Sequence, residues 1–278
     1  MKTVKHTLLV ILLPLLVVLA ACNSGNTSHE QAGTANAQAK AEPNPAAPGF
    51  NAAKSDQAAV KLADEVMEAL GGRKQWDDTR YIEWTFFGRR KLLWDKHAGH
   101  VQVEVPTTGL KVLLDMNNNQ GMVWFNDQQQ LEADTVSKYL ARAKNWWIND
   151  SYWLVMPYKL KDSGVTLTYV GEDTVQEGGA AQVIELRFEG VGVTPQNKYL
   201  VYVDPDSKLV NQWAYYTNAN DTVPGFVLPW EGYKEYNGIK LPSGHGMLKR
   251  GRTTPSLANV AVYTTLSPDP FAKLTPNQ

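Results

Sequence analysis

Residues 81–125 decide the fold, and their sequence is YIEWTFFGRRKLLWDKHAGHVQVEVPTTGLKVLLDMNNNQGMVWF. Apolar and polar side chains alternate over 81–87 and again over 101–105, and alternation with a period of two is typical of a strand with one buried face. The apolar runs are separated by residue types that form turns, DKHAG at 95–99 and NNNQG at 117–121. The stretch therefore predicts a meander of antiparallel strands with one apolar face.

The rest of the chain extends this pattern with two helical segments and a second run of strands. The first helix is expected over 56–70, where apolar residues recur at intervals of three and four, and a second helical block over 134–148. A strongly apolar stretch, WWINDSYWLVM at 146–156, overlaps the end of that block. Further strands are expected at 165–170, 182–188, 198–203, 209–216, Leu248 and 260–266.

This order predicts an α+β fold, mostly β, built as one large curved antiparallel sheet: a half-barrel with helices packed on its apolar concave face. A closed β-barrel with peripheral helices is the alternative architecture. Six aromatic residues are expected on the apolar face, which is either a filled core or the lining of a cavity. These candidate ligand-binding residues are Trp84, Phe86, Trp94, Trp124, Trp213 and Tyr215.

The N-terminus carries a separate signal. Lys2 and Lys5 precede an apolar run that is too short to span a membrane, because a spanning helix needs roughly 20 apolar residues. The run ends in LAAC at 19–22, and Cys22 is the one cysteine of the chain. This arrangement resembles a bacterial lipoprotein signal, which implies that residues 1–21 are removed and that Cys22 is acylated.

The signal implies an organisation in three parts. After the signal peptide, residues 22–53 are expected to form the lipidated N-terminus and a disordered tether, because they offer little apolar surface to bury. Residues 54–278 are long enough for a single domain with a sizeable core. Asn23 follows the cysteine, and resemblance to enteric lipoproteins then implies the outer membrane, facing the periplasm. The expected location is the cell envelope, with the lipid on Cys22 as the membrane contact.

Charge and motifs argue against several classes of function. Without residues 1–21 the chain keeps 25 of its 27 basic residues against all 28 acidic ones, which argues against nucleic acid as a partner. His245 lies in a glycine-rich loop with no nucleophile signature, and Asp95, His97 and His100 lie at a predicted turn. The sequence therefore predicts no catalytic residue, no metal site and no cofactor, and the protein is not expected to be an enzyme.

Two clusters of basic residues stand out, RRK at 89–91 and KRGR at 249–252. Such clusters can contact anionic lipid head groups, at about 1 kcal/mol per residue. A charge run is more often a solvated surface, and that is the expectation for both clusters.

The order of a helix, a meander, a helical block and a second meander on a lipoprotein resembles the LolA and LolB families of the Gram-negative envelope. Stretches at 153–162, 199–204 and 212–216 also look like segments of uncharacterised envelope lipoproteins related to that fold. The resemblance covers roughly residues 54–274. It implies an unclosed barrel, capped by helices, whose concave apolar cavity holds acyl chains.

The sequence thus leaves two functions open. The first is a lipid-anchored envelope protein that binds or carries an acyl chain or another hydrophobic ligand. The alternative is a non-catalytic structural or interaction lipoprotein whose apolar face is packed shut. The sequence does not indicate a protein partner for either function.

Overall fold

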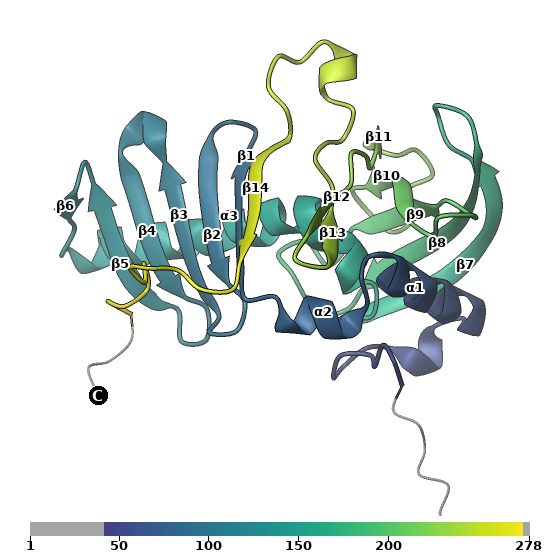
Figure 1. Cartoon of the computed structure of the whole chain (residues 1–278), viewed down its shortest axis with the longest axis horizontal. Coiled ribbons are helices and arrows are strands. Elements are labelled where there is room, and N and C mark those ends of the chain that lie inside the picture. The colour runs from purple at the N-terminus through teal and green to yellow at the C-terminus, as the bar shows by residue number, and fades with distance from the viewer. Residues whose placement is uncertain (1–41, 275–278) are drawn as a thin grey trace, which may run out of the picture. The chain divides into compact units, whose positions relative to one another are not determined.

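Two antiparallel sheets form the framework of the computed structural model, which describes residues 42–274 (Figure 1). The first sheet has seven strands, in the order β14 (Leu257–Tyr263), β1 (Tyr81–Phe86), β2 (Arg90–Asp95), β3 (His100–Val105), β4 (Leu110–Asp115), β5 (Gln120–Phe125) and β6 (Gln128–Gln129). The second sheet has five strands, in the order β11 (Phe226–Pro229), β10 (Val210–Tyr216), β9 (Lys198–Val203), β8 (Ala180–Phe188) and β7 (Val165–Thr174). A short hairpin is formed by β12 (Lys234–Tyr236) and β13 (Ile239–Leu241).

Helices cover the inner side of these sheets. They are α1 (Gln57–Ala69), α2 (Arg73–Asp78) and α3 (Ala133–Val155), with short 3-10 helices η1 (Ala52–Lys54), η2 (Pro106–Thr108), η3 (Met156–Lys159) and η4 (Leu248–Arg250). The long helix α3 contacts β3, β4 and β5. Glycine is required at position 121 on β5, because a Cβ there would lie 2.0 Å from the Leu113 carbonyl oxygen on β4 and 2.7 Å from Leu140 Cδ2 of the helix.

The predicted fold class is confirmed: the chain is α+β and mostly β, with a large unclosed antiparallel sheet and helices on its apolar face. Three details differ from the prediction. The half-barrel is divided into two sheets, α3 continues to Val155 instead of ending near 148, and Leu248 lies in η4 rather than in a strand. The described strands do not close into a barrel.

One core lies between the inner faces of the sheets and the helices. It includes Trp84 and Val103 of the first sheet, Met67 of α1, Leu154 of α3 and Trp213 of β10, all of which are buried. Alternation along the strands places these side chains inward, as the sequence predicts for Trp84. Burial of this continuous apolar surface is the main stabilising contribution to the fold.

The outer face of the first sheet has its own apolar cluster beneath the C-terminal segment. Phe271 is buried there against Tyr81 and other residues, and Trp124 packs against the same cluster. The ammonium of Lys273 lies 5.4 Å from the centre of the Trp124 ring. On β5 the residue that faces the main core is Val123, the neighbour of Trp124. The prediction that Trp124 lies on the inner face is therefore wrong.

The folded domain begins earlier than the sequence predicts. Residues 42–53 were assigned to the tether, but they pack on the domain and form one unit with it. The Ala47 amide donates to the carbonyl of Lys161 at 3.0 Å, and the Asn51 amide donates to the carbonyl of Val165 at 3.0 Å. The segment therefore lies beside the start of β7, a strand that pairs on its other side with β8, and it covers an otherwise open sheet edge.

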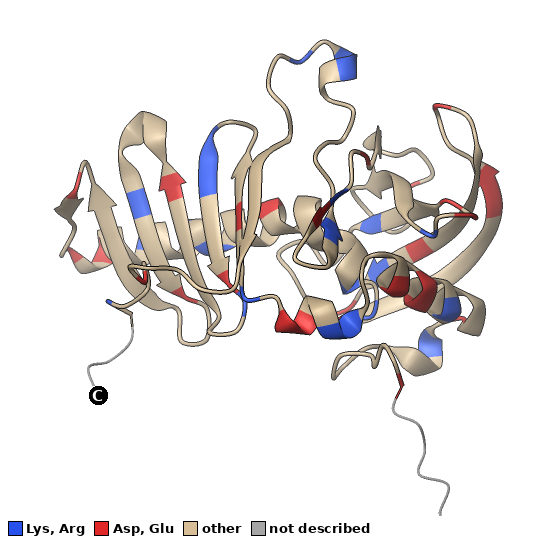
Figure 2. Ribbon diagram, in the orientation of Figure 1, with Lys and Arg blue, Asp and Glu red and all other residues tan. Residues whose placement is uncertain are grey.

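Lys161 fixes the beginning of this segment by charge. Its ammonium is buried and lies 2.8 Å from carboxylate oxygens of both Glu42 and Asp64, and 2.6 Å from the carbonyl oxygen of Asn44. A buried cation needs such partners, since its desolvation is costly. The helices nearby, α1 and α2, carry residues of both signs (Figure 2). Sequence reasoning missed the segment because backbone and ionic contacts, rather than periodic apolar residues, hold it.

The predicted signal peptide, Cys22 and the first part of the tether lie outside the described residues, as do residues 275–278. Within residues 42–274, no helix combines the length and the hydropathy that a membrane-crossing helix needs.

Candidate functional site

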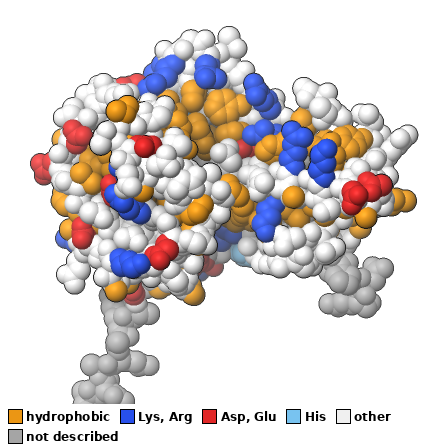
Figure 3. Space-filling model, turned by 180° about the vertical axis from the view of Figure 1, so that it is seen from behind, with side chains coloured by type: hydrophobic (Ala, Val, Ile, Leu, Met, Phe, Trp, Pro, Cys, Tyr) orange, Lys and Arg blue, Asp and Glu red, His pale blue; other side chains and the backbone are white. Residues whose placement is uncertain are grey.

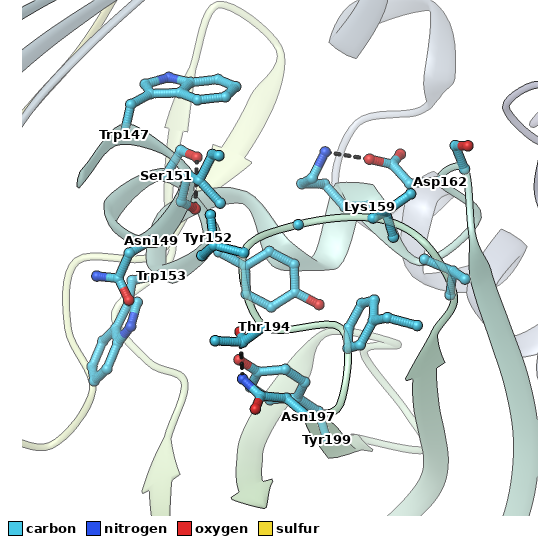
Figure 4. Close-up of a pocket in the computed structure, with 17 residues that line it drawn as sticks. Trp147, Asn149, Ser151, Tyr152, Trp153, Lys159, Asp162, Thr194, Asn197 and Tyr199 are labelled. Carbon is cyan, nitrogen blue, oxygen red and sulfur yellow. Dashed lines mark hydrogen bonds and ion pairs between the residues drawn. The ribbon is translucent and has the colours of Figure 1, made fainter. Parts of the chain in front are cut away.

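A pocket of about 360 Å³ lies where the C-terminal part of α3 meets the ends of β8 and β9 (Figure 4). Its walls come from α3, the residues that follow it up to the start of β7, the end of β8, the β8–β9 loop and β9. The volume lies within the range of small-molecule sites, which are concave and mostly apolar. We call it the Tyr152 pocket. Its lining residues are Trp147, Ile148, Asn149, Ser151, Tyr152, Trp153, Lys159, Asp162, Ser163, Val165, Phe188, Val191, Gly192, Val193, Thr194, Asn197 and Tyr199.

Aromatic side chains from three elements form the inner wall of the Tyr152 pocket. The ring centre of Tyr152 lies 5.4 Å from that of Tyr199 on β9 and 6.3 Å from that of Phe188 at the end of β8. Phe188 and Tyr199 meet edge to face, at 5.7 Å and 88°. Edge-to-face contacts fix the rings relative to one another, so the wall has a defined shape.

The β8–β9 loop forms the opposite wall. It contains Gly190 and Gly192 in positive-φ conformations, 67° and 73°, which other residues rarely adopt. These turns place Val191 and Val193 at the pocket, and Val193 is still 51% exposed. No local sequence pattern indicates this role, because the wall forms only where the loop meets α3.

Polar groups of the Tyr152 pocket are few. Lys159 and Asp162 form an ion pair with each other, and Asn197 donates to the Thr194 hydroxyl at 2.7 Å. The Tyr152 hydroxyl is buried and has no hydrogen-bond partner among the described residues, and Figure 4 shows its ring pointing in among the lining side chains. Burial raises the pKa of Tyr152 well above its usual value of 10, so the hydroxyl stays neutral and can donate a hydrogen bond.

The six predicted cavity residues do not line this pocket. Trp84 is buried in the core, and Trp94 packs edge to face on Trp147, with ring centres 5.2 Å apart. Trp213 lies behind the wall of the Tyr152 pocket and stacks on Tyr199, with ring centres 5.4 Å apart and an interplanar angle of 7°.

Two of the remaining candidates, Phe86 and Tyr215, also lie on inner faces but away from the Tyr152 pocket. Tyr215 stacks on Phe226, with ring centres 5.0 Å apart. The sequence left open whether these residues are core or cavity lining. Trp84, Trp94 and Trp213 are packed core, Phe86 lines a second hollow, and Trp124 lies on the outer face. Strand alternation locates inward-facing residues, but a helix end and a loop build the pocket, and alternation says nothing about these.

A second hollow, of about 550 Å³, lies on the other side of Trp153. We call it the arginine hollow because two of its lining residues are arginines. Figure 3 shows hydrophobic side chains gathered on this side of the molecule with Lys and Arg side chains beside them. Its lining residues are Phe86, Phe87, Asn149, Trp153, Phe226, Leu228, Met247, Arg250 and Arg252. Asn149 and Trp153 line both spaces, so α3 separates the two.

His245 is buried between aromatic rings close to both spaces. Its ring centre lies 4.6 Å from Trp230 and 5.1 Å from Trp153, and its Nδ1 lies 2.8 Å from the Ser256 hydroxyl. Burial lowers the pKa of His245 to about 3, so the imidazole is neutral at physiological pH. The arrangement offers a nearby hydroxyl, but no carboxylate orients the ring as a catalytic triad requires.

This burial makes the stability of the protein depend on pH. Unfolded His245 titrates near pH 6.5, so between pH 6.5 and about 3 the unfolded state binds a proton that the folded state does not. The free energy of unfolding should then fall by up to about 1.4 kcal/mol per pH unit as the pH drops through this window. In His245→Gln this part of the slope should disappear. Denaturant titrations from pH 7.5 to 4 measure it, and parallel curves for the two proteins would contradict the assignment.

The suggestive Asp, His, His spacing at the β2–β3 turn has a structural role. Asp95 accepts hydrogen bonds from Arg80 and from the amides of His97 and Ala98, and these contacts lower its pKa against the opposing effect of burial. His100 lies 4.0 Å from an oxygen of Asp115. Across residues 42–274, no group of three or more His, Cys, Asp or Glu side chains is placed to hold a metal ion.

No protein-family model matches the sequence, and no curated protein is similar to it in sequence. Solved structures with a similar arrangement include a DUF1329 family protein from Desulfovibrio piger, with 12% identity, a TM-score of 0.39, and coverage of 75% of this chain and 95% of that one. They also include a LolA superfamily protein from Nitrosomonas europaea, with 11% identity, a TM-score of 0.35, and coverage of 72% and 93%.

Proposed function

We propose that this chain is a lipid-anchored protein of the cell envelope that binds an acyl chain or another apolar ligand in the Tyr152 pocket. The observation that carries the proposal is the pocket itself: about 360 Å³, walled by Tyr152, Phe188 and Tyr199, with two valines at its loop side. Each methylene group that enters such a space contributes about 0.8 kcal/mol, so six would contribute roughly 5 kcal/mol before the cost of ordering.

The unpartnered Tyr152 hydroxyl of the pocket supports a ligand with one polar atom. This hydroxyl is buried without a hydrogen-bond partner among the described residues. Leaving a buried donor unsatisfied costs about 1–3 kcal/mol. A hydroxyl, ester or carboxyl oxygen on the ligand would recover part of that cost, whereas a pure hydrocarbon would not.

A second candidate function is that of an interaction lipoprotein with a closed core. The observation that favours it is the dense packing of Trp84 and Trp213, which were expected to line a cavity and are instead buried. The two functions differ in one property: only the first requires saturable binding of an apolar molecule.

A matched pair of variants tests the first function. Val193 and Val170 are similarly exposed, at 51% and 55%, but only Val193 lines the Tyr152 pocket. A carboxylate at 193 would lie against a buried apolar ligand, so Val193→Glu should weaken binding of the neutral probe N-phenyl-1-naphthylamine at least about tenfold. Val170→Glu should bind like wild type.

Both substitutions should change the free energy of unfolding by no more than about 0.5 kcal/mol, since they are at exposed positions. The binding is measured by the rise in probe fluorescence on titration. Equal affinities for the two variants, or no saturable binding to wild type, would remove the Tyr152 pocket as the site and favour the interaction lipoprotein.

The membrane anchor is part of the same proposal and rests on the sequence around Cys22. Cys22→Ser removes the expected acylation site. The variant should leave the membrane fraction or accumulate as the unprocessed precursor, as shown by fractionation and intact mass. A variant that is cleaved normally and still sediments with membranes would contradict lipidation at this residue.

A further inference from the structure

The fold brings together two basic clusters that are about 160 residues apart in the sequence. The β1–β2 turn carries the first cluster, and the amide of Phe87 in this turn donates to the carbonyl of Ser256 at 3.0 Å. That bond holds the turn beside the 246–256 loop, which carries the second cluster on and next to η4. Between the two lies the arginine hollow, lined by Phe87 as well as by Arg250 and Arg252.

Two of the six basic residues in the clusters form ion pairs elsewhere. Arg90 forms an ion pair with Asp150, and Lys249 pairs with Glu177 and Glu231. Lys91 on β2 lies opposite Glu104 of β3 in the strand register. Its neighbour Leu92 faces the inner core, so Lys91 faces the outer side of the sheet.

Three arginines remain. Arg250 donates from Nη2 to the Val227 carbonyl at 2.7 Å and to Gln176 at 3.0 Å, which holds its guanidinium in place. The Arg252 and Arg89 side chains make no hydrogen bond or ion pair with residues 42–274. No acidic residue lines the hollow, so nothing in its wall neutralises the arginines.

The floor of the hollow is apolar. Six of its nine lining residues are large apolar side chains: Phe86, Phe87, Trp153, Phe226, Leu228 and Met247. Arg90 packs on Phe86 of this floor, with its guanidinium carbon 5.3 Å from the ring centre. The hollow therefore combines a hydrophobic surface with uncompensated guanidinium groups at one side.

We infer that the arginine hollow is a second binding site, for an anionic amphiphile. Guanidinium groups bind phosphate and carboxylate oxygens through paired N–H donors, and Arg250 and Arg252 supply them. The apolar tail would lie on the aromatic floor, where a free inorganic anion has nothing to contact. Charge complementarity selects the anionic head, and the floor selects the tail. This site is separate from the Tyr152 pocket, which has no unpaired cation in its wall.

Three probes separate the contributions of the anionic head and the apolar tail to binding: decyl phosphate, 1-decanol and inorganic phosphate. Each is titrated below its micellar concentration, and binding is followed by calorimetry. Decyl phosphate should bind wild type at least tenfold more tightly than inorganic phosphate. Arg252→Gln should weaken decyl phosphate at least about fivefold and Arg252→Glu further, because Arg252 supplies charge without holding the fold. Lys91→Gln, which removes one charge on the other side of β2, should bind like wild type.

Each outcome bears on the site. If Arg252→Glu binds decyl phosphate like wild type, or if inorganic phosphate binds as tightly as decyl phosphate, the inference is overturned. If Val193→Glu abolishes decyl phosphate binding while Arg252→Glu does not, the amphiphile occupies the Tyr152 pocket and the second site is refuted. Arg252→Glu should leave the binding of 1-decanol unchanged, because this neutral probe enters the Tyr152 pocket. Refuting the second site would therefore not refute the proposed function.

Discussion

Removing one partner of the Arg90–Asp150 ion pair should lower the free energy of unfolding by about 3–5 kcal/mol, because a buried charge is left without its counter-ion. Asp150 is 0% exposed, and its two oxygens accept from Arg90 at 2.6 and 2.9 Å. The pair joins the start of β2 to α3, and Arg90 also lies 5.2 Å from the ring centre of Trp146. Asp150→Ala therefore removes both a contact between sheet and helix and the carboxylate that pairs with this guanidinium among residues 42–274.

Two controls make this prediction specific. Arg187→Ala breaks the pair with Glu185 at a side chain that is 46% exposed, and it should cost no more than about 1 kcal/mol. Replacing both buried partners, in Arg90→Met with Asp150→Leu, should recover much of the loss, since apolar side chains can replace a buried pair. Urea titrations of the four proteins measure these differences. If Asp150→Ala costs no more than Arg187→Ala, the pair is not the buried link described here.

Trp213→Ala should cost about 3–5 kcal/mol, the usual range for truncating a large buried aromatic residue. Trp213 is 1% exposed and stands at the centre of a cluster of rings, with Trp153 at 5.1 Å and Trp230 at 5.1 Å between ring centres. Truncation leaves a cavity that these rigid neighbours cannot fill.

Trp124→Ala is the matched control for Trp213→Ala. Trp124 is only partly buried, on the outer face beneath Lys273, so its truncation should cost clearly less. Chemical denaturation of both variants provides the comparison. A cost below about 1 kcal/mol for Trp213→Ala would mean that this ring borders open space, as first expected from the sequence, and not a filled core.

Strand alternation explains how much of this fold the sequence could predict. Over 81–87 polar and apolar residues alternate, so Trp84 could be placed inward. Over 122–125 the sequence is MVWF, an unbroken apolar run with no alternation, and the side of Trp124 could not be decided from it. The C-terminal segment that covers Trp124 is a long-range contact, which no local pattern reports.

The end of α3 explains why the pocket could not be predicted. Asn149, Asp150 and Ser151 interrupt the apolar stretch 146–156. Because these residue types favour caps and turns, the sequence predicts that the helix ends near 148. In the structure Asp150 is satisfied by Arg90, 60 residues earlier, and the helix continues. Tyr152 is thereby placed on a helix facing β9, which creates the wall of the pocket.

The basic clusters illustrate the same limit. We expected both clusters to be solvated surface. Arg90 departs from this expectation because successive side chains of a strand face opposite sides of the sheet, and Arg90 lies on the inward side. Whether Arg250 and Arg252 border apolar side chains depends on a loop that folds back onto β11, which the sequence does not specify.

Locating a bound ligand by NMR tests directly whether an apolar molecule enters the Tyr152 pocket. Amide NMR spectra of the protein are recorded during titration with neutral 1-decanol. Saturable shifts are expected only at the pocket walls, at Asn149, Tyr152, Phe188, Val193 and Tyr199, with none at Trp124. No saturable shifts at these residues, or shifts centred on other parts of the protein, would overturn the proposed function.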